Sequence, residues 1–428
     1  MMRIIYVILS YLLLPVFALY WIMRGVGNHT YWDRMGQRFG LGFPRLEDGS
    51  IWVHAVSVGE VQAAVPLVRA LQSRFPDRQI LITTVTPTGA AHVRSLFGED
   101  VCHSYIPFET PSAVGKFFDA VKPVLALIME TEIWPNLYHA CGSRKIPLVL
   151  VSARISPKSL KNYRRLLPLF RETLSHGILI AAQGEADAKR FLMLGASPAR
   201  TWITGNIKFD IELPPDLGIR GAKLRHDIIG NRPVWIAAST HDGEEEQVLA
   251  AHKIVLQSLP DAVLILVPRH PERFAVVQSL LQKKQWKFVT RTSHKPVPSA
   301  AEVLLGDTMG ELPLFYAASD VAFVGGTLVP VGGHNLLEPG SLGLPVITGP
   351  HLFHTQDIAA LFTDVGASIT VQNAEELAGA VLPLLEDDDM AQEMGQKGKQ
   401  VIASNKGALQ RLLVLLEPLV GQVNKRAS

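Results

Sequence analysis

Acidic side chains follow two apolar stretches that have the character of buried strands. Glu60 comes soon after the stretch 51–56, and Glu130 and Glu132 close the stretch 124–129. Burying carboxylates at strand ends is costly unless they are paired or used, so one of the two later acids should face a ligand. Glu60 at such an edge can accept a proton from an attacking hydroxyl. Structural roles compete: Glu60 as a first-turn acid stabilised by a helix dipole, and an acid near 130 as a cap for the following helix.

Basic and hydroxyl groups recur in the loops that follow later apolar stretches. Lys208 lies in the turn 204–210, where a cation can neutralise a leaving phosphate, although a lone exposed lysine is usually solvated. Ser239 and His241 follow the stretch 234–238, and their hydroxyls and backbone N–H groups suit an anion. Arg269 follows the next stretch and suits a phosphate or a base edge.

The densest polar segment is glycine-rich and runs from 325 to 339. Gly332 and Gly333 are expected to expose N–H groups toward a phosphate, and Asn335 can cap the helix that follows. Glu338, one turn into that helix, can accept both hydroxyls of a ribose. Neither a Walker A nor a GxGxxG pattern is present, which argues against an NTPase or a dinucleotide enzyme. His241 and His270 lack partners at helical spacing, so a metal site is disfavoured.

Overall composition excludes several classes of protein. The chain has 428 residues, 41 Lys and Arg against 39 Asp and Glu, and a formal net charge of +2. This balance gives no support for a nucleic-acid binder, which needs a basic face. The two cysteines, Cys102 and Cys141, cannot form a disulfide framework or a four-cysteine zinc site, which fits a reduced compartment.

The segment 4–23 contains no charged residue and lies between Arg3 and Arg24. As a helix it would span roughly 30 Å, the thickness of a bilayer core. A cleaved signal peptide, a buried core helix and a membrane anchor compete, and we favour the anchor because no small-residue cleavage site follows the run. Arg24, Arg34 and other nearby arginines predict that the body lies on the cytoplasmic side. Whether the helix spans, or lies in one leaflet with a kink at Pro15, stays open.

Short apolar stretches alternate with helical patterns twice along the chain. The first set lies at 51–56, 80–84, 124–129, 148–151 and 178–182, and the second at 234–238, 263–267, 303–305, 321–324 and 345–347. Such stretches, apolar on both faces, are typical of buried parallel strands. A proline-rich break at 212–218 separates the sets. The sequence therefore predicts two doubly wound α/β domains, with ligands outside the carboxyl ends of the strands and in the cleft between the domains.

The assembled motifs resemble the 3-deoxy-D-manno-octulosonic acid (Kdo) transferase family over essentially the whole chain. The segments that carry the resemblance are 57–60, 129–136, 205–210, 239–245, 267–273, 306–312 and 332–338. The resemblance implies a GT-B glycosyltransferase with two Rossmann-like domains. It divides the chain into an anchor (1–27), an acceptor-binding domain (28–211), a CMP-sugar-binding domain (212–400) and a C-terminal helix (401–428) that packs back toward the N-terminal domain.

The resemblance also assigns roles to individual residues. Glu60 would be the general base, and Glu130 and Lys208 would stabilise the transition state. The implied contacts to CMP are Pro268, Arg269, Met309, Gly310, Glu311, Asn335, Leu336, Leu337 and Glu338, while Ser239, His241, Gly332 and Gly333 are possible donor-site residues. One departure is Gln37, where we expect Glu in relatives, and it puts an acceptor-side or structural contact in doubt.

The implied reaction transfers Kdo from CMP-β-Kdo to the lipid A precursor lipid IV-A, with inversion, during lipopolysaccharide biosynthesis at the cytoplasmic face of the bacterial inner membrane. Because CMP leaves as a monophosphate, we expect neither a metal nor a cofactor. Two alternatives remain. Another GT-B transferase or epimerase would use a UDP-sugar, and a non-catalytic membrane scaffold would explain the anchor but not the polar loops at strand ends.

Overall fold

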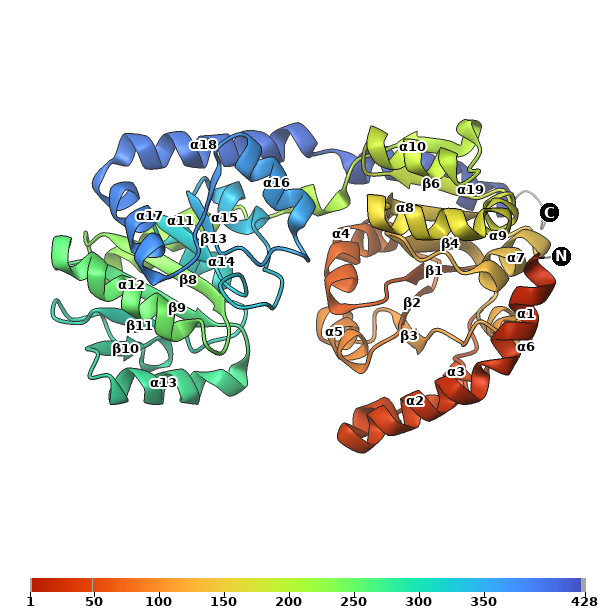
Figure 1. Cartoon of the computed structure of the whole chain (residues 1–428), viewed down its shortest axis with the longest axis horizontal. Coiled ribbons are helices and arrows are strands. Elements are labelled where there is room, and N and C mark those ends of the chain that lie inside the picture. The colour runs from red at the N-terminus through yellow and green to blue at the C-terminus, as the bar shows by residue number, and fades with distance from the viewer. Residues whose placement is uncertain (1, 48, 425–428) are drawn as a thin grey trace. The chain divides into compact units, whose positions relative to one another are not determined.

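The computed structural model describes residues 2–47 and 49–424, and the chain forms two compact units (Figure 1). Unit 1 comprises the chain up to Asp210 together with the segment from Asn405 onwards, and unit 2 comprises Ile211–Ser404. Each unit contains one seven-stranded sheet in which every neighbouring pair is parallel. The predicted fold class, two doubly wound α/β domains, is confirmed.

The sheet of unit 1 has the strand order β3-β2-β1-β4-β5-β6-β7. Its strands are β1 (Ser50–His54), β2 (Ile80–Thr84), β3 (Cys102–Tyr105), β4 (Pro123–Met129), β5 (Leu148–Ala153), β6 (Leu179–Ala182) and β7 (Thr201–Ile203). Successive residues of β1 enter different cores, since Ile51 and Val53 pack on one face and Trp52 on the other. Both faces of the sheet are therefore covered, which explains the nearly continuous apolar runs.

Helices cover the two faces of this sheet. One face carries α4 (Val58–Arg74), α5 (Pro87–Phe97) and α19 (Ala408–Asn424). The other carries α6 (Pro111–Val121), α7 (Pro135–Ser143), α9 (Leu167–Leu174) and α10 (Glu185–Met193). The short helices α3 (Met35–Arg38) and α8 (Pro157–Tyr163) complete this part of the unit.

The sheet of unit 2 repeats the pattern, with the strand order β10-β11-β9-β8-β12-β13-β14. Its strands are β8 (Val234–Thr240), β9 (Val263–Pro268), β10 (Phe288–Thr290), β11 (Val303–Leu305), β12 (Val321–Val324), β13 (Val346–Thr348) and β14 (Ser368–Thr370). Its helices are α11 (Leu217–Leu224), α12 (Glu245–Ser258), α13 (Phe274–Lys283), α14 (Leu312–Ala317), α15 (Leu337–Leu342), α16 (Gln356–Asp364), α17 (Ala374–Glu386) and α18 (Asp388–Asn405).

The last helix, α19, belongs to the core of unit 1 although the whole of unit 2 precedes it in the chain. Its buried residues Ala408, Leu412, Leu416 and Val420 pack against α4 and β4. The Asp210 carboxylate fixes its start, because Oδ1 accepts the Gly407 N–H and Oδ2 accepts the Leu409 N–H, each at 2.6 Å. One carboxylate thus closes the amino end of the helix that returns to unit 1.

The N-terminal apolar segment forms two helices instead of the one predicted, α1 (Met2–Leu12) and α2 (Leu14–Gly27), with Pro15 in the first turn of α2. None of the described helices is by itself long and apolar enough to cross a bilayer. Taken together, α1 and α2 have the required length and composition, but the pair is bent by 42°. The helix is therefore interrupted at Leu13, close to the kink expected at Pro15.

One face of the α1–α2 pair rests on unit 1. The Tyr6 side chain hydrogen-bonds to Glu109, and the Tyr11 hydroxyl accepts the Ser112 N–H at 3.2 Å. Trp21 is buried, and the Arg38 guanidinium lies 3.7 Å from the centre of its ring. The pair is thus docked on the globular body through hydrogen bonds and a cation–π contact.

Gln37 has a structural role that explains its amide. The buried side chain accepts the Tyr105 N–H at 2.9 Å through Oε1 and donates to the Gly42 carbonyl at 3.1 Å through Nε2. An ionised glutamate cannot make the second bond because it has no hydrogen to donate. Gln37 therefore links α3 to β3 and also to the loop that follows α3.

We expect Asp210→Ala to lower the free energy of unfolding by about 1–2 kcal/mol, because two N–H groups of α19 lose their acceptor. Hydrogen exchange in α19 should accelerate at the same time, and urea unfolding of the full chain measures the loss. Asp216→Ala is the control, since among the described residues that exposed carboxylate pairs with exposed Arg220 alone. Its removal should change stability by at most about 0.5 kcal/mol. Equal losses in the two variants would refute the capping role.

Candidate functional site

The two predicted catalytic acids of unit 1 lie where the strand order of its sheet reverses. Strands β1 and β4 are neighbours, yet the chain runs outward from β1 to β3 on one side and from β4 to β7 on the other. Ligands of open α/β sheets bind at such a switch point, beyond the carboxyl ends of the strands. Glu60 follows β1 and Glu130 follows β4, so the topology brings these two acids to one edge.

Glu60 lies in the first turn of α4 and is held through one oxygen. Its Oε2 accepts the Val56 N–H at 2.8 Å, and no other hydrogen bond or ion pair joins it to a described residue. Burial raises the pKa of Glu60 from 4.5 to about 8, and the charges of Glu130 and Glu132 add to this, while the Val56 bond and Lys208 act in the opposite direction. The carboxyl therefore has one fixed oxygen and one oxygen without a partner.

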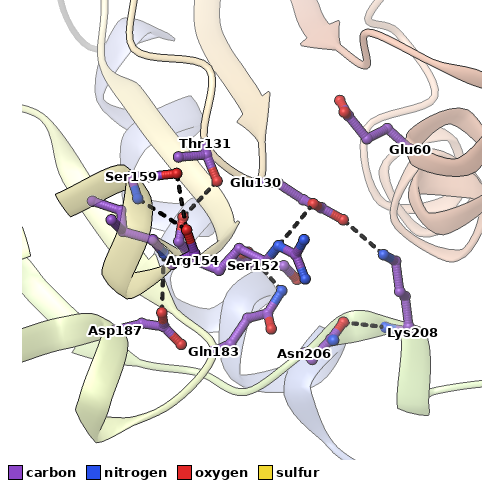
Figure 2. A network of polar contacts seen from close by, with 12 residues as sticks. Glu60, Glu130, Thr131, Ser152, Arg154, Ser159, Gln183, Asp187, Asn206 and Lys208 are labelled. Atoms are coloured by element: carbon purple, nitrogen blue, oxygen red, sulfur yellow. Dashed lines mark hydrogen bonds and ion pairs between the residues drawn. The ribbon is translucent and has the colours of Figure 1, made fainter. Parts of the chain in front are cut away.

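Glu130 is fixed on both sides by cations. Its carboxylate contacts Lys208 Nζ at 2.7 Å and Arg154 Nε at 3.3 Å, as Figure 2 shows, and its side chain is 15% exposed. The residue has a φ of 54°, a left-handed conformation that is unfavourable for a side chain with a Cβ. Glu60 lies nearby without a contact to any residue drawn in the figure.

A hydrogen-bonded frame positions Lys208. The lysine belongs to the 3₁₀ turn Ile207–Phe209, whose first N–H donates to Ser152 Oγ at 3.1 Å. Asn206 Oδ1 accepts the Lys208 N–H at 3.0 Å, and Gln183 donates to the Ser152 carbonyl. Lys208, which was predicted from an isolated turn, is thus held in place by hydrogen bonds to and around that turn. The sequence of the turn alone did not indicate this support.

The capping role considered for Glu130 and Glu132 belongs to a residue that the sequence analysis missed. Glu109 accepts the Asn136 and Leu137 N–H groups at the start of α7, at 2.9 and 2.8 Å. Burial raises the pKa of Glu109 to about 7, although both N–H bonds oppose the shift. Glu132 instead accepts the indole N–H of Trp134 at 2.6 Å. The capping alternative is therefore wrong for both acids.

In unit 2 the strand order reverses between β8 and β12, and the predicted donor-site loops follow these two strands. Glu244, which the sequence analysis did not single out, links them. Its buried carboxylate accepts the N–H groups of His241, Gly326, Thr327 and Leu328 at 2.7–3.2 Å. The glycine-rich loop after β12 is thus clamped to the loop after β8.

The glycine-rich loop does not offer the N–H groups that we expected. Gly332 and Gly333 both donate to the Gly326 carbonyl, at 3.0 and 2.8 Å. The expectation that these two N–H groups are free for a phosphate is therefore wrong, because the loop folds back on itself. Each has a φ above 80°, a conformation that glycine adopts without strain.

Glu338, the acid expected to bind the ribose, is hydrogen-bonded to Asn335. Glu338 Oε1 accepts a bond from Asn335 Nδ2 at 3.1 Å, and Asn335 Oδ1 accepts the Leu337 N–H at 3.0 Å, which matches the expected capping role. Burial raises the pKa of Glu338, while Asn335 and the charge of Arg269 lower it. Leu336 and Leu337, two further predicted contacts, are buried as whole residues.

The remaining predicted nucleotide contacts follow β9 and β11. Pro268 ends β9, and Ser239, the residue before the last one of β8, has a left-handed conformation with a φ of 57°. The Glu311 carboxylate is held by Arg291, at 3.1 and 2.8 Å, and by Thr308, and these bonds lower its pKa. Met309 is 59% exposed beside Gly310. In this loop Met309 and the backbone of Gly310 therefore remain open to a ligand.

Two protein families match this chain, one in unit 1 and the other in unit 2. Residues 33–211 match a family described as 3-deoxy-D-manno-octulosonic-acid transferase (kdotransferase), and residues 237–401 match glycosyl transferases group 1. A 3-deoxy-D-manno-octulosonic acid transferase of Haemophilus influenzae is 41% identical over 98% of this chain and 99% of its own length. The corresponding transferase of Bordetella pertussis is 37% identical over 90% of each chain.

Solved structures with low sequence identity share the fold. A UDP-GlcNAc 2-epimerase from Neisseria meningitidis bound to UDP-GlcNAc is 16% identical, covers 85% of this chain and 99% of its own, and gives a TM-score of 0.55. Anabaena Alr3699/HepE in complex with UDP is 17% identical, covers 87% of this chain and all of its own, and gives a TM-score of 0.54. These structures support the architecture, and the full-length relatives show that the chain is a glycosyltransferase of the 3-deoxy-D-manno-octulosonic acid transferase family.

Proposed function

We propose that this protein transfers Kdo from CMP-β-Kdo to a hydroxyl of lipid IV-A, with Glu60 as the general base. The observation that carries the proposal is the state of the Glu60 carboxyl. One oxygen is fixed by the Val56 N–H, the other has no partner among the described residues, and the pKa is about 8. A base of this pKa is well matched to proton abstraction near neutral pH.

The proposed reaction is a direct displacement. The acceptor hydroxyl gives its proton to Glu60, its oxygen bonds to the anomeric carbon, and the bond from that carbon to the phosphate oxygen breaks. The electron pair stays on the phosphate, and CMP departs from the face opposite the attack, so the anomeric centre inverts. Lys208, held by Glu130 at 2.7 Å, supplies positive charge for the developing transition state.

The proposed donor contacts lie in unit 2. Arg269 suits the phosphate or the cytosine edge, and Glu338 suits the ribose hydroxyls. Because CMP carries a single phosphate, the site does not have to grip a diphosphate, and we propose that transfer is independent of metal ions. A UDP-sugar donor is the alternative that an assay with several donors distinguishes.

The N-terminal helices are the proposed membrane contact. Seven large apolar side chains on α1 and α2 are more than half exposed and recur every three or four residues, so they form one stripe: Ile4, Ile8, Leu12, Val16, Leu19, Met23 and Val26. The opposite face rests on unit 1, which favours a pair that lies in one leaflet. We propose attachment to the cytoplasmic face of the bacterial inner membrane, where an acylated acceptor would reside.

Glu60→Gln should lower kcat by about 10²- to 10⁴-fold, because the amide cannot accept the hydroxyl proton. The amide oxygen can still accept the Val56 N–H, so the variant separates the chemical role from the loss of this hydrogen bond. In the assay, purified protein is incubated with CMP-Kdo and lipid IV-A, and the molecular masses of the lipid products are measured. Parallel reactions contain UDP-sugars as alternative donors.

Glu185→Gln is the matched control for this variant. Glu185 also lies in the first turn of a unit 1 helix, but it is exposed, and Lys189 is its one ion-pair partner in the part of the chain that the structure describes. Its replacement should leave turnover unchanged. Near-normal activity of Glu60→Gln, with CMP-Kdo turned over, would contradict the proposed base, and activity with UDP-sugars alone would contradict the proposed donor.

We expect kcat/KM to rise with pH along an acidic limb with an apparent pKa near 8. The sign follows from the role of Glu60: its proton must leave before the carboxylate can act, and its pKa in the free enzyme is about 8. A rate series from about pH 6 to about pH 9 measures the limb. A profile that is already flat at pH 6 would show that no group of raised pKa limits the reaction.

A further inference from the structure

Four histidines gather at the carboxyl edge of the sheet of unit 2. His241 follows β8, His270 follows β9, and His334 precedes α15, while His354 interacts electrostatically with His334. His241 Nε2 and His334 Nε2 lie 2.7 Å apart, and the two rings are within 7° of parallel. This distance is that of a hydrogen bond between the two imidazoles.

The short contact limits how many protons the pair can hold. One hydrogen lies between the two Nε2 atoms, so one ring donates and the other accepts. A second hydrogen there would place two donors face to face. The pair is therefore neutral, with opposite tautomers, or carries a single positive charge, and it titrates as a unit. No hydrogen bond to either Nδ1 atom occurs among the described residues, so both remain available to a ligand.

Burial, together with nearby charges, disfavours a positive charge on the pair. Burial lowers the pKa of His241 to about 4 and that of His334 to about 3, and the charges of Arg269, His270 and Arg273 add to the shift of His241. Arg269, His270 and His354 act on His334 in the same direction. Guanidinium groups and imidazoles at this edge are hydrogen-bond donors of the kind that bind phosphate.

The carboxylates of the same loops are engaged by other groups. Glu244 is occupied by four N–H groups, and Asp242 and Glu245 both pair with Arg273. Glu338 lies beside Asn335. The carboxylates therefore have their own partners, whereas the imidazole Nδ1 atoms do not.

Five N–H groups of the glycine-rich loop are already bonded within the protein. Its N–H groups at 326, 327 and 328 donate to Glu244, and those of Gly332 and Gly333 donate to the Gly326 carbonyl. Gly326 has no side chain, and a Cβ there would lie 3.1 Å from His334 and 3.4 Å from His241. The loop thus accommodates the imidazole pair closely.

We propose that the His241–His334 pair binds the phosphate of the nucleotide and takes up one proton as a phosphate monoester dianion binds. The inference rests on the proposed function insofar as CMP is the nucleotide. As the bond from the anomeric carbon to the phosphate oxygen breaks, the electron pair stays on that oxygen and the phosphate gains one negative charge. The proton, taken from solvent, gives the pair the positive charge that balances it.

Calorimetric titration of the full chain with CMP tests this directly. The apparent enthalpy is measured at about pH 7.5 and about pH 8.5, where free CMP is the dianion because the second pKa of its phosphate is about 6. Buffers of different ionisation enthalpy are compared, and the difference gives the protons taken up. We expect uptake of a fraction of a proton that is larger at the lower pH. Uptake of zero in the unaltered protein at both pH values, with CMP bound, overturns the proposal without any variant.

His241→Gln and His334→Gln should each abolish the uptake and weaken CMP binding about tenfold, because a charged hydrogen bond to the phosphate is lost. Cytidine, which has no phosphate, should bind the variants and the unaltered protein equally. The control is His226→Gln, an exposed histidine in the turn Arg225–Ile229, which should change neither quantity. Thermal unfolding confirms that each variant is folded, and undiminished uptake in a folded variant overturns the proposal.

Titrations with UMP separate this inference from the proposed function. Equal uptake and affinity with UMP and CMP would leave the phosphate-binding pair intact and contradict the choice of a cytidine donor. Binding of CMP without dependence on either histidine would contradict the pair and leave the donor assignment intact.

Discussion

Carboxylates that are wholly or partly buried at the edges of two parallel sheets are the constraint on which this structure depends, because their negative charge must be stabilised by N–H groups or cations. Glu244 accepts four N–H groups and clamps two loops, and Glu109 accepts two and caps α7. Glu130 is held by two cations. Glu60 alone of these four has a single N–H and no cation. The other three acids hold the fold with both of their oxygens engaged, whereas Glu60 combines a raised pKa with one oxygen that no described residue engages, and so keeps the capacity to take a proton.

The same topology places the functional residues in both units. The strand order reverses between β1 and β4 in unit 1 and between β8 and β12 in unit 2, and the candidate residues follow these central strands. At a reversal, the connections leave in opposite directions and expose the strand ends. The backbone is strained at both edges, since Glu130 and Ser239 have positive φ values. Such strain persists only where the surrounding structure holds it, as Lys208 and Arg154 do for Glu130.

The sequence predicted the central strands and missed all four edge strands, β3, β7, β10 and β14, for a physical reason. Apolar runs identify strands buried on both faces, and edge strands are short and partly polar, as Cys102–Tyr105 is. Glu60, Glu130 and Lys208 were predicted because they follow strands or match family motifs. Glu109 and Glu244 were missed, and the free N–H groups expected at Gly332 and Gly333 are absent, because hydrogen-bond partners distant in sequence become visible only in three dimensions.

The most direct test of this account is the titration of the Glu60 carboxyl itself. Carbon-13 NMR of protein labelled in its glutamate side chains follows each carboxyl through a pH series, and the signal missing from Glu60→Gln identifies the residue. The account predicts that this signal titrates at about pH 8. Titration near the ordinary value of 4.5 would show that burial does not hold the proton there, and Glu60 would lose the property that singles it out as the base.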